Sequence, residues 1–303
     1  MITRDTAAFA RFARGCAGDF GPACAKAAFL VAPEGFALAE QSASDNRYMD
    51  MQVTVDAQRA LAEHRQLQQA LSGSLPTLCF PGRVDTPDAQ FPNNVFATAP
   101  GRLILGHMRH PVRQREAERE DIRGFFRDLL GYEEIDLRAQ PGICELTGAL
   151  IIDRVHGLGY CGLSERCDET GAAAMHAAFG LRATLLFDLA PGEYHSNVVL
   201  SVLAGRAVVI APDGLADAVA AEAIAGLYAP HAIVLSPAER NAFAGNCLAL
   251  SGHEVWMSRT AEQALSAANA AALTRAGFAV RAATLDEIEK AGGSLRCCVA
   301  EIF

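Results

Sequence analysis

The sequence lacks the features that mark several large classes of protein. It has no apolar run long enough for a signal peptide or a membrane span, and Arg and Asp are scattered through its first 21 residues. No Gly/Ser-rich or Pro-rich linker divides it, and no Gly-rich loop follows a predicted strand, so neither a dinucleotide-binding turn nor a P-loop is expected. The Ala-rich, Arg-containing N-terminus leaves a helix and a transit peptide as open alternatives.

Paired cysteines and excess positive charge are also missing. The nine cysteines are an odd number without Cys-x-x-Cys spacing, so we expect reduced thiols, no zinc site and a cytoplasmic location. The formal net charge of −9 argues against nucleic-acid partners. With 51% hydrophobic residues in a chain of 303, a sizeable core can be buried. These properties are typical of a soluble enzyme.

Short apolar segments alternate with helical stretches throughout. The order strand–strand–helix–strand recurs about five times with short connections, which predicts one α/β domain of repeated units. Strands are predicted at Lys26–Pro33, Asn94–Thr98, Arg102–Gly106, Gly148–Arg154, His156–Cys161, Asn197–Leu203, Arg206–Pro212, Ala232–Leu235, Cys247–Ser251, Glu254–Ser258 and Phe278–Ala282. Helices are predicted at Ala57–Leu71, Arg113–Leu130, Glu169–Gly180, Ala216–Tyr228 and Thr260–Ala276.

Three polar segments could carry chemistry. The first is the run Gly-Gly-Ser-Leu-Arg-Cys-Cys, residues 292–298, in which the cation of Arg296 could lower the pKa of a neighbouring thiol. The second places His195 directly before an apolar strand, and an imidazole suits acid–base work near neutral pH. The third places Glu145 in an apolar approach to a strand, where it could orient a base. The structural alternatives are a turn with two core cysteines, a surface histidine and a loop cap.

Taken together, these segments resemble the guanidine-modifying superfamily of arginine deiminases, dimethylargininases and amidinotransferases, and most of all its citrulline-utilisation hydrolase branch. The resemblance runs from about Phe29 to the end of the sequence. Eight sets of motifs occur in the order of the superfamily: Phe29-Leu-Val-Ala-Pro with Ser44-Asp-Asn-Arg-Tyr-Met, Phe91-Pro-Asn-Asn-Val-Phe-Ala-Thr, Arg113-Gln-Arg-Glu, Glu145-Leu-Thr-Gly, Gly162-Leu-Ser-Glu-Arg, Tyr194-His-Ser-Asn-Val, Phe243-Ala-Gly-Asn and the run from Gly292 to Phe303.

The resemblance implies a pentein-type fold, a five-bladed α/β propeller formed by residues 26–303, with residues 1–25 as an N-terminal extension. It implies that Cys297 is the nucleophile, His195 the acid–base group and Glu145 the carboxylate that holds substrate nitrogen. The site would need neither a metal nor an organic cofactor, and its partner would be a small amino acid. The resemblance also leaves a homodimer open.

The substrate is predicted from departures within these motifs. In arginine-cleaving relatives, carboxylates hold the guanidinium, whereas the corresponding region here contains Asn93, Asn94 and Phe96, and Asn197 follows His195 by two residues. A buried cation without counter-charge is costly, while amides suit a neutral ureido group. We therefore expect hydrolysis of citrulline to ornithine, ammonia and carbon dioxide. Further candidate contacts are Arg113 and Arg166 for the α-carboxylate and the cover segment with Asp45 and Asn46; a salt bridge is the alternative for either arginine.

Three other functions remain open at this stage. A dimethylargininase or deiminase could recruit a second carboxylate from Asp45, Asp88 or Glu193. An amidinotransferase would pass the group to an amine rather than to water. A binding protein on the same propeller would not be catalytic, although this sequence retains the cysteine, histidine and acid in register.

Overall fold

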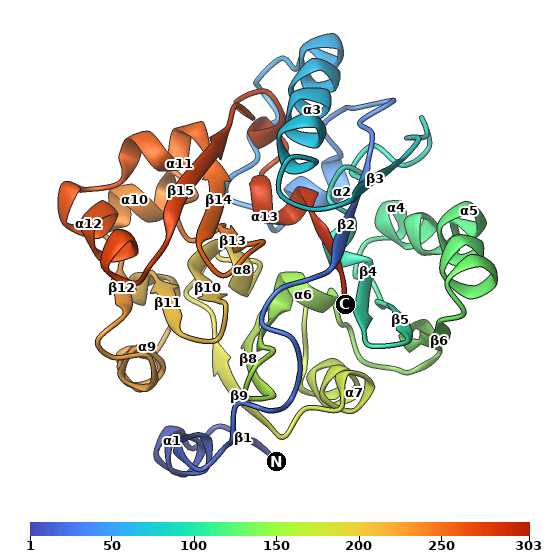
Figure 1. The fold of residues 1–303 in the computed structure, drawn as a ribbon. Helices are drawn as coiled ribbons and strands as arrows, with labels where there is room; N and C mark the ends of the chain where they lie inside the picture. The colour runs from blue at the N-terminus through green and yellow to red at the C-terminus, as the bar shows by residue number, and fades with distance from the viewer.

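The computed structural model describes residues 1–303 and shows five small sheets placed around the middle of the molecule (Figure 1). In each sheet an inner strand runs antiparallel to a middle strand, and the middle strand pairs in parallel with an outer strand. From inner to outer strand, the sheets are β16-β2-β3 (Ala300–Ile302, Ala27–Val31, Thr77–Phe80), β4-β5-β6 (Phe96–Ala99, Arg102–Leu105, Glu133–Asp136), β7-β8-β9 (Leu150–Asp153, Leu158–Leu163, Ala183–Asp188), β10-β11-β12 (Leu200–Leu203, Ala207–Ile210, Ala232–Val234) and β13-β14-β15 (Leu248–Ala249, Glu254–Ser258, Ala279–Ala283).

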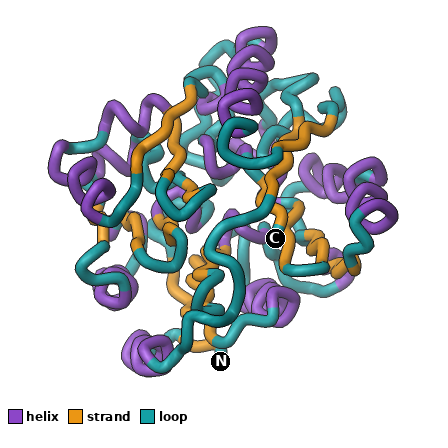
Figure 2. The backbone as a smooth tube through the Cα atoms, viewed as in Figure 1, coloured by secondary structure: helices purple, strands orange, loops and turns teal.

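The helices are α1 Thr6–Arg14, α2 Glu40–Ala43, α3 Ala57–Leu71, α4 Pro111–Gln114, α5 Glu120–Gly124, α6 Leu146–Ala149, α7 Glu169–Phe179, α8 Ser196–Val199, α9 Ala218–Leu227, α10 Pro237–Asn241, α11 Arg259–Ala264, α12 Ala267–Arg275 and α13 Leu295–Cys298. The longer helices lie at the periphery, while the single-turn helices α6, α8 and α13 lie nearer the middle (Figure 1 and Figure 2). Parallel pairing requires a crossover, which α9 supplies between β11 and β12. Because helices cover these sheets, their middle strands are buried apolar runs such as the Ala-Val-Val-Ile of β11.

The first sheet joins distant parts of the sequence. Inner strand β16 pairs antiparallel with β2, with Ala300 opposite Phe29. The segment before β2 is also structured, since β1 (Ile2–Thr3) extends the third sheet along β9 and α1 contacts both β9 and α9. None of the helices is both long and apolar enough to cross a bilayer.

Two predicted helices are broken in the structure. The predicted helix Thr260–Ala276 is divided into α11 and α12, because Leu265 is extended and Ser266 accepts a hydrogen bond from the backbone N–H of Asn269 to begin a new helix. The predicted helix Arg113–Leu130 is interrupted at Arg119, whose backbone is extended between a 3-10 turn and α5. At Ser266 local capping overrides a continuous apolar pattern, whereas at Arg119 no side-chain cap accompanies the break.

His64 makes the stability of the fold depend on pH. Its side chain is fully buried on α3, and burial disfavours the imidazolium and lowers the pKa of His64 to about 4. The imidazole of an unfolded chain has a pKa near 6.5, so acid favours unfolding by up to about 3 kcal/mol from this group. That stability is present above pH 6.5 and is lost as the pH falls toward 4.

We expect His64→Leu to remove this part of the acid sensitivity. Urea unfolding of the variant and the parent at pH 7 and pH 4.5 should show a smaller loss of unfolding free energy in the variant. Exposed His253, changed to Gln, is the matched control and should behave like the parent. Equal losses in His64→Leu and the parent would contradict the assignment.

Candidate active site

Each inner strand is preceded by a tight turn, and each of the five turns supplies one buried polar residue. Asn94 ends a 3-10 turn before β4, Glu145 precedes α6 and His195 precedes α8. Asn246 lies just before β13, and Cys297 lies in α13 before β16. All five side chains are at most 3% exposed. Because the inner strands lie at the middle of the molecule, residues from five distant segments are gathered at one end of them.

Amide groups surround the sulfur of Cys297. The Nδ2 groups of Asn197 and Asn246 lie 3.6 and 3.4 Å from Sγ and are oriented to donate to it. Asn246 also accepts a hydrogen bond from the backbone N–H of Arg296 at 2.9 Å and donates to the carbonyl of Asn197 at 2.7 Å. Asn246 therefore links the turn of the nucleophile to the turn after His195.

Burial disfavours the thiolate form of Cys297 in the free protein. Burial raises its pKa above the usual value, and the Ser294 backbone, Asn246, Arg296 and Asn197 only partly offset this. Arg296 lowers the pKa of this thiol, as the sequence suggested, but its contribution is smaller than those of the Ser294 backbone and Asn246, and its guanidinium pairs with Glu301 at 3.0 Å. The adjacent Cys298 is fully buried in an apolar cluster, and burial raises its pKa well above the usual range.

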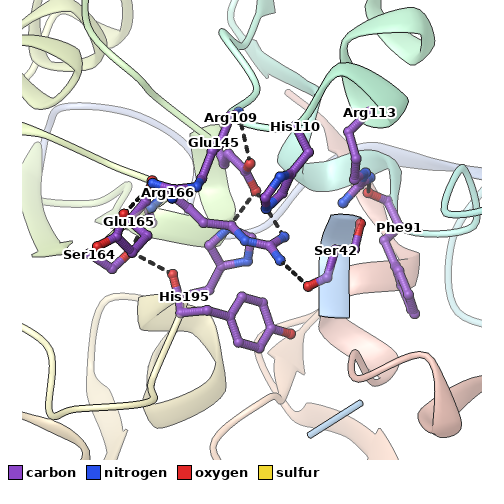
Figure 3. Close-up of polar contacts among 12 residues, drawn as sticks. Ser42, Phe91, Arg109, His110, Arg113, Glu145, Ser164, Glu165, Arg166 and His195 are labelled. Carbon is purple, nitrogen blue, oxygen red and sulfur yellow. Dashed lines mark hydrogen bonds and ion pairs between the residues drawn. The ribbon is translucent and has the colours of Figure 1, made fainter. Parts of the chain in front are cut away.

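His195 and Glu145 form a buried pair. Nε2 of His195 lies 2.8 Å from Oε2 of Glu145, and neither side chain is exposed (Figure 3). Burial alone would raise the pKa of Glu145, but Arg166 at 3.5 Å and the hydrogen bond with His195 lower it to about 2. Burial lowers the pKa of His195, although Glu145 opposes the shift. Both shifts favour a carboxylate on Glu145 and a neutral imidazole on His195.

The other nitrogen of His195 makes no hydrogen bond and lies beside Gly148. Nδ1 is buried without a hydrogen-bond partner, as is Oδ1 of Asn94. A Cβ atom added at Gly148 would lie 2.8 Å from Nδ1 and 2.7 Å from Asn94 Oδ1. Glycine at this position therefore leaves the space that these two polar atoms share. The free nitrogen can carry a proton in the reaction, while Glu145 fixes the ring.

A small cavity lies in front of the nucleophile. It has room for about one water molecule, and its lining residues are Ser42, Asn46, Met49, Asp88, Phe91, Asn94, Arg113, Arg166, Tyr194, Ala291, Gly293 and Cys297. Asp88 accepts from Ser42 Oγ at 2.5 Å through Oδ2, while its buried Oδ1 has no partner. Arg113 holds Glu116 at 2.7 and 2.8 Å, and Arg166 donates to the Ser42 carbonyl at 2.8 Å. The cavity thus presents one carboxylate and two guanidinium groups.

The segment from Ser42 to Met49 covers this cavity and is anchored on two sides. Asp45 accepts from Arg166 at 2.5 and 3.0 Å and lies 3.0 Å from His110 Nε2 (labelled with Arg166 in Figure 3). On the other side, the Tyr48 hydroxyl donates to Glu193 at 2.9 Å. The segment is thus held in place over a cavity with room for about one water molecule.

The predicted site residues are not all placed in the cavity. Asn94, Asn46, Arg113, Arg166 and Cys297 line it. Asn197, His195 and Glu145 do not, although Asn197 contacts the sulfur of Cys297 and the other two are paired behind the cavity wall. Asn93 is buried, with no hydrogen-bond partner for its side-chain amide, and it does not line the cavity. Phe96 lies away from the cavity and packs in the core, with its ring centroid 6.2 Å from that of Phe29. Phe96 is already the first residue of β4, whereas Asn94 lies in the turn before this strand.

Other residues of the site were not singled out from the sequence. These are Ser42, Met49, Phe91, Tyr194, Ala291, Gly293 and Asn246. Gly292 is required next to them, since its φ is +74° and a Cβ would meet the amide of Asn46 at 2.3 Å. No cluster of three or more His, Cys, Asp or Glu side chains is placed to hold a metal ion.

The raised pKa of Cys297 predicts low reactivity of the free protein toward iodoacetamide. Burial raises the pKa of this thiol and so disfavours the reactive thiolate, and the residue is 1% exposed. We expect alkylation of the exposed Cys79 to precede that of Cys297 at pH 7, with the rate at Cys297 rising steeply above pH 9. Peptide mass mapping from pH 6 to pH 10 measures both rates. Faster modification of Cys297 than of Cys79 at pH 7 would show an ionised thiol instead.

Comparisons with known proteins agree with this arrangement. The family model of the eukaryotic N,N dimethylarginine dimethylhydrolases matches residues 32–303. The N(G),N(G)-dimethylarginine dimethylaminohydrolase of Mycobacterium tuberculosis is 29% identical over 265 residues, which are 85% of this chain and 80% of the relative. The N-terminal domain of ArgZ, an arginine dihydrolase from the ornithine-ammonia cycle in cyanobacteria, superposes with a TM-score of 0.78 at 19% identity, covering 91% of this chain and 97% of that domain.

A second solved structure is similar in fold. It is a variant dimethylarginine dimethylaminohydrolase in an adduct with S-methyl-L-thiocitrulline, with a TM-score of 0.70, 19% identity, and 92% of this chain and all of that chain covered. At these identities the structural matches establish a shared mixed α/β fold.

Proposed function

Since this chain belongs to the N,N dimethylarginine dimethylhydrolase family, we propose that it is a cysteine hydrolase that converts citrulline to ornithine, ammonia and carbon dioxide. The members of this family compared above are hydrolases of carbon–nitrogen bonds in guanidino compounds, and this chain is a hydrolase of that class. The proposal adds the substrate. The observation that supports it is the chemistry around the nucleophile. The amides of Asn197 and Asn246 contact the sulfur of Cys297, and no carboxylate is hydrogen-bonded to it.

The reacting end of the substrate would meet neutral groups. Asn94 lines the cavity with a buried Oδ1 that has no partner, and an amide oxygen can accept from an NH₂ group. Asn197 and Asn246 contact Sγ, so their amides lie beside the carbon that the sulfur would attack. Glu145 is already bound by His195 and Arg166. A neutral ureido group fits these surroundings with less electrostatic cost than a guanidinium.

The other end of the substrate would meet charged groups. A free amino acid carries an α-ammonium and an α-carboxylate. Asp88, with one free oxygen, suits the ammonium, and the guanidinium groups of Arg113 and Arg166 suit the carboxylate. Both arginines already hold acids, so the substrate carboxylate would share their donors with Glu116 and Asp45.

The reaction follows from these roles. As the sulfur adds to the ureido carbon, the thiol proton passes to His195, which gives it to the departing nitrogen, so that ammonia leaves and a thiocarbamate remains on Cys297. His195 then takes a proton from water, which attacks the thiocarbamate and frees the thiol. The carbamate released in this way loses carbon dioxide to give ornithine. Glu145 stabilises the imidazolium in both halves.

Asp88 favours a second candidate, hydrolysis of arginine or dimethylarginine. Its free buried oxygen faces the same cavity as Cys297 and could accept from a cationic guanidinium. The similarity to a dimethylarginine dimethylaminohydrolase and to an arginine dihydrolase points the same way. Against it, the groups in contact with the sulfur of Cys297 are the amides of Asn197 and Asn246, with no carboxylate among them.

Parallel assays decide between the two. Purified protein is incubated with citrulline, arginine or asymmetric dimethylarginine, and ornithine, citrulline, ammonia and dimethylamine are quantified. Ornithine formed from citrulline supports the proposal. Conversion of arginine to citrulline with citrulline left intact, or release of dimethylamine as the main activity, would replace it with a deiminase or dimethylargininase.

An acceptor control addresses transfer to an amine. If product forms only when glycine is added, the chain is an amidinotransferase.

Two further proposals concern the fold and the cellular location of the enzyme. A five-bladed propeller over residues 26–303 is supported by the five repeated sheets, and a cytoplasmic location is supported by the nine unpaired cysteines. A homodimer stays a proposal that sedimentation can test.

A further inference from the structure

A second cavity lies at the far ends of the inner strands from the catalytic turns. It is lined by Phe20, Gly21, Pro22, Ala99, Pro100, Arg102, Arg154, Phe179, Gly180 and Phe303. Ala99 ends β4, Arg154 follows β7 and Phe303 follows β16, whereas Asn94, Glu145 and Cys297 precede these same strands. The length of an inner strand therefore separates the two cavities by roughly 10–15 Å.

Arg154 is the unusual group in this cavity. Its Nη1 donates a hydrogen bond to the carbonyl of Thr98 at 3.1 Å. This bond uses only one of the five N–H donors of the guanidinium. Other arginines of this protein that are equally or more buried, such as Arg113 and Arg166, are paired with carboxylates, but no carboxylate lies within 4.0 Å of Arg154. Burial lowers the pKa of Arg154 to about 10, since Glu301 compensates only in part and Arg296 adds repulsion.

Aromatic and apolar groups surround this cation. The guanidinium carbon lies 4.1 Å from the ring centre of Phe303 and 5.2 Å from that of Phe179. Phe20 forms another wall, held by a hydrogen bond from its N–H to the Val155 carbonyl. A second cation, Arg102, lines the same cavity and has only a distant carboxylate, Glu133 at 4.0 Å. The cavity thus combines the guanidinium of Arg154, which has no carboxylate partner, with the half-exposed guanidinium of Arg102 and apolar walls.

We propose that this cavity binds a small organic anion, a carboxylate or phosphate attached to a flat apolar group. The anion would pair with Arg154 and Arg102, because a guanidinium fork matches both kinds of oxyanion. The apolar part would lie against Phe20, Phe179 and Phe303. Residues 20–22 precede the part of the chain matched by the family model, which begins at residue 32, so family membership does not imply this site.

Binding can be tested independently of catalysis. We would use Cys297→Ala protein, so that turnover plays no part, and measure thermal stability and calorimetric binding with benzoate, phenyl phosphate, adenosine monophosphate, inorganic phosphate and neutral benzamide. We expect benzoate or one of the phosphate esters to raise the melting temperature and benzamide to have no effect. Binding of benzoate would indicate a carboxylate ligand, and binding of a phosphate ester would indicate a phosphate ligand.

Substitutions locate the binding. Arg154→Gln, in the same background, should weaken binding at least tenfold, and Arg154→Lys should weaken it less because the charge is kept. Arg102→Gln provides a second test if Arg154→Gln fails to fold. Arg166→Gln, in the catalytic cavity, is the matched control and should leave binding unchanged. The proposal is overturned if no anion binds, if benzamide binds as well as benzoate, or if Arg166→Gln rather than Arg154→Gln abolishes binding.

Discussion

Replacing Cys297 by alanine should abolish turnover, whereas the same change at Cys298 should leave it largely intact. The first residue lines the cavity and contacts two amides, while the second is enclosed in the core. Loss of a covalent nucleophile costs about 10⁴-fold or more in kcat. Cys298→Ala leaves a small void, so we expect a lower melting temperature and a kcat within about fivefold of the parent.

The two variants form a matched pair because the residues are neighbours. Ornithine release from citrulline measures turnover, and mass spectrometry after acid quenching should find an adduct on the peptide with Cys297 in the parent only. An adduct on Cys298, or substantial turnover by Cys297→Ala, would remove Cys297 from its proposed role.

Glu145→Gln and His195→Gln should each lower kcat by about 10² to 10⁴, the usual contribution of general acid–base catalysis. The kcat of the double variant should be little lower than that of the less active single variant, because the two side chains act as one hydrogen-bonded unit. A simple loss of structure would instead lower the melting temperature in step with activity, which circular dichroism measures.

The pH profile separates orientation of the imidazole from a structural role. Glu145 raises the pKa of His195, although burial lowers it overall. Activity requires neutral His195 to accept the thiol proton, so it falls as acid protonates the ring. In Glu145→Gln the imidazolium loses its anionic partner, its pKa drops, and the acid limb moves to lower pH. An acid limb that stays in place, or moves to higher pH, would contradict the pairing.

Much of the repeated architecture could be predicted from apolar patterning, but several outer strands could not. β9 is the clearest case: Ala-Thr-Leu-Leu-Phe-Asp is buried at five of its six positions, so it lacks the alternation that marks a half-exposed strand. β3 and β6 were missed for the opposite reason, since they are short and partly exposed. Their pairing depends on middle strands supplied by distant parts of the chain.

The site shows the same division. Motifs indicated Cys297, His195 and Glu145, because each lies in a local pattern. The partnership of Asn246 with the sulfur was not predictable, since 51 residues separate them and only the packing of two inner strands brings them together. Asp88 likewise has one oxygen bonded to the hydroxyl of Ser42, 46 residues earlier in the sequence, and one oxygen without a partner. Local sequence motifs therefore predict the reactive groups, whereas the charges and hydrogen bonds around these groups depend on tertiary contacts.

The pairing of β16 with β2 has a consequence for synthesis of the protein. The two strands lie about 270 residues apart in sequence, and β16 directly follows the turn that holds Cys297. At translation rates of about 5–20 residues per second, β2 waits roughly 15 to 55 s for this partner. During that time the edge of β2 is open to mispairing, and the ribosome-bound chain has no nucleophile in place. Cys297 can therefore take its place beside the other catalytic turns only after β16 has been made.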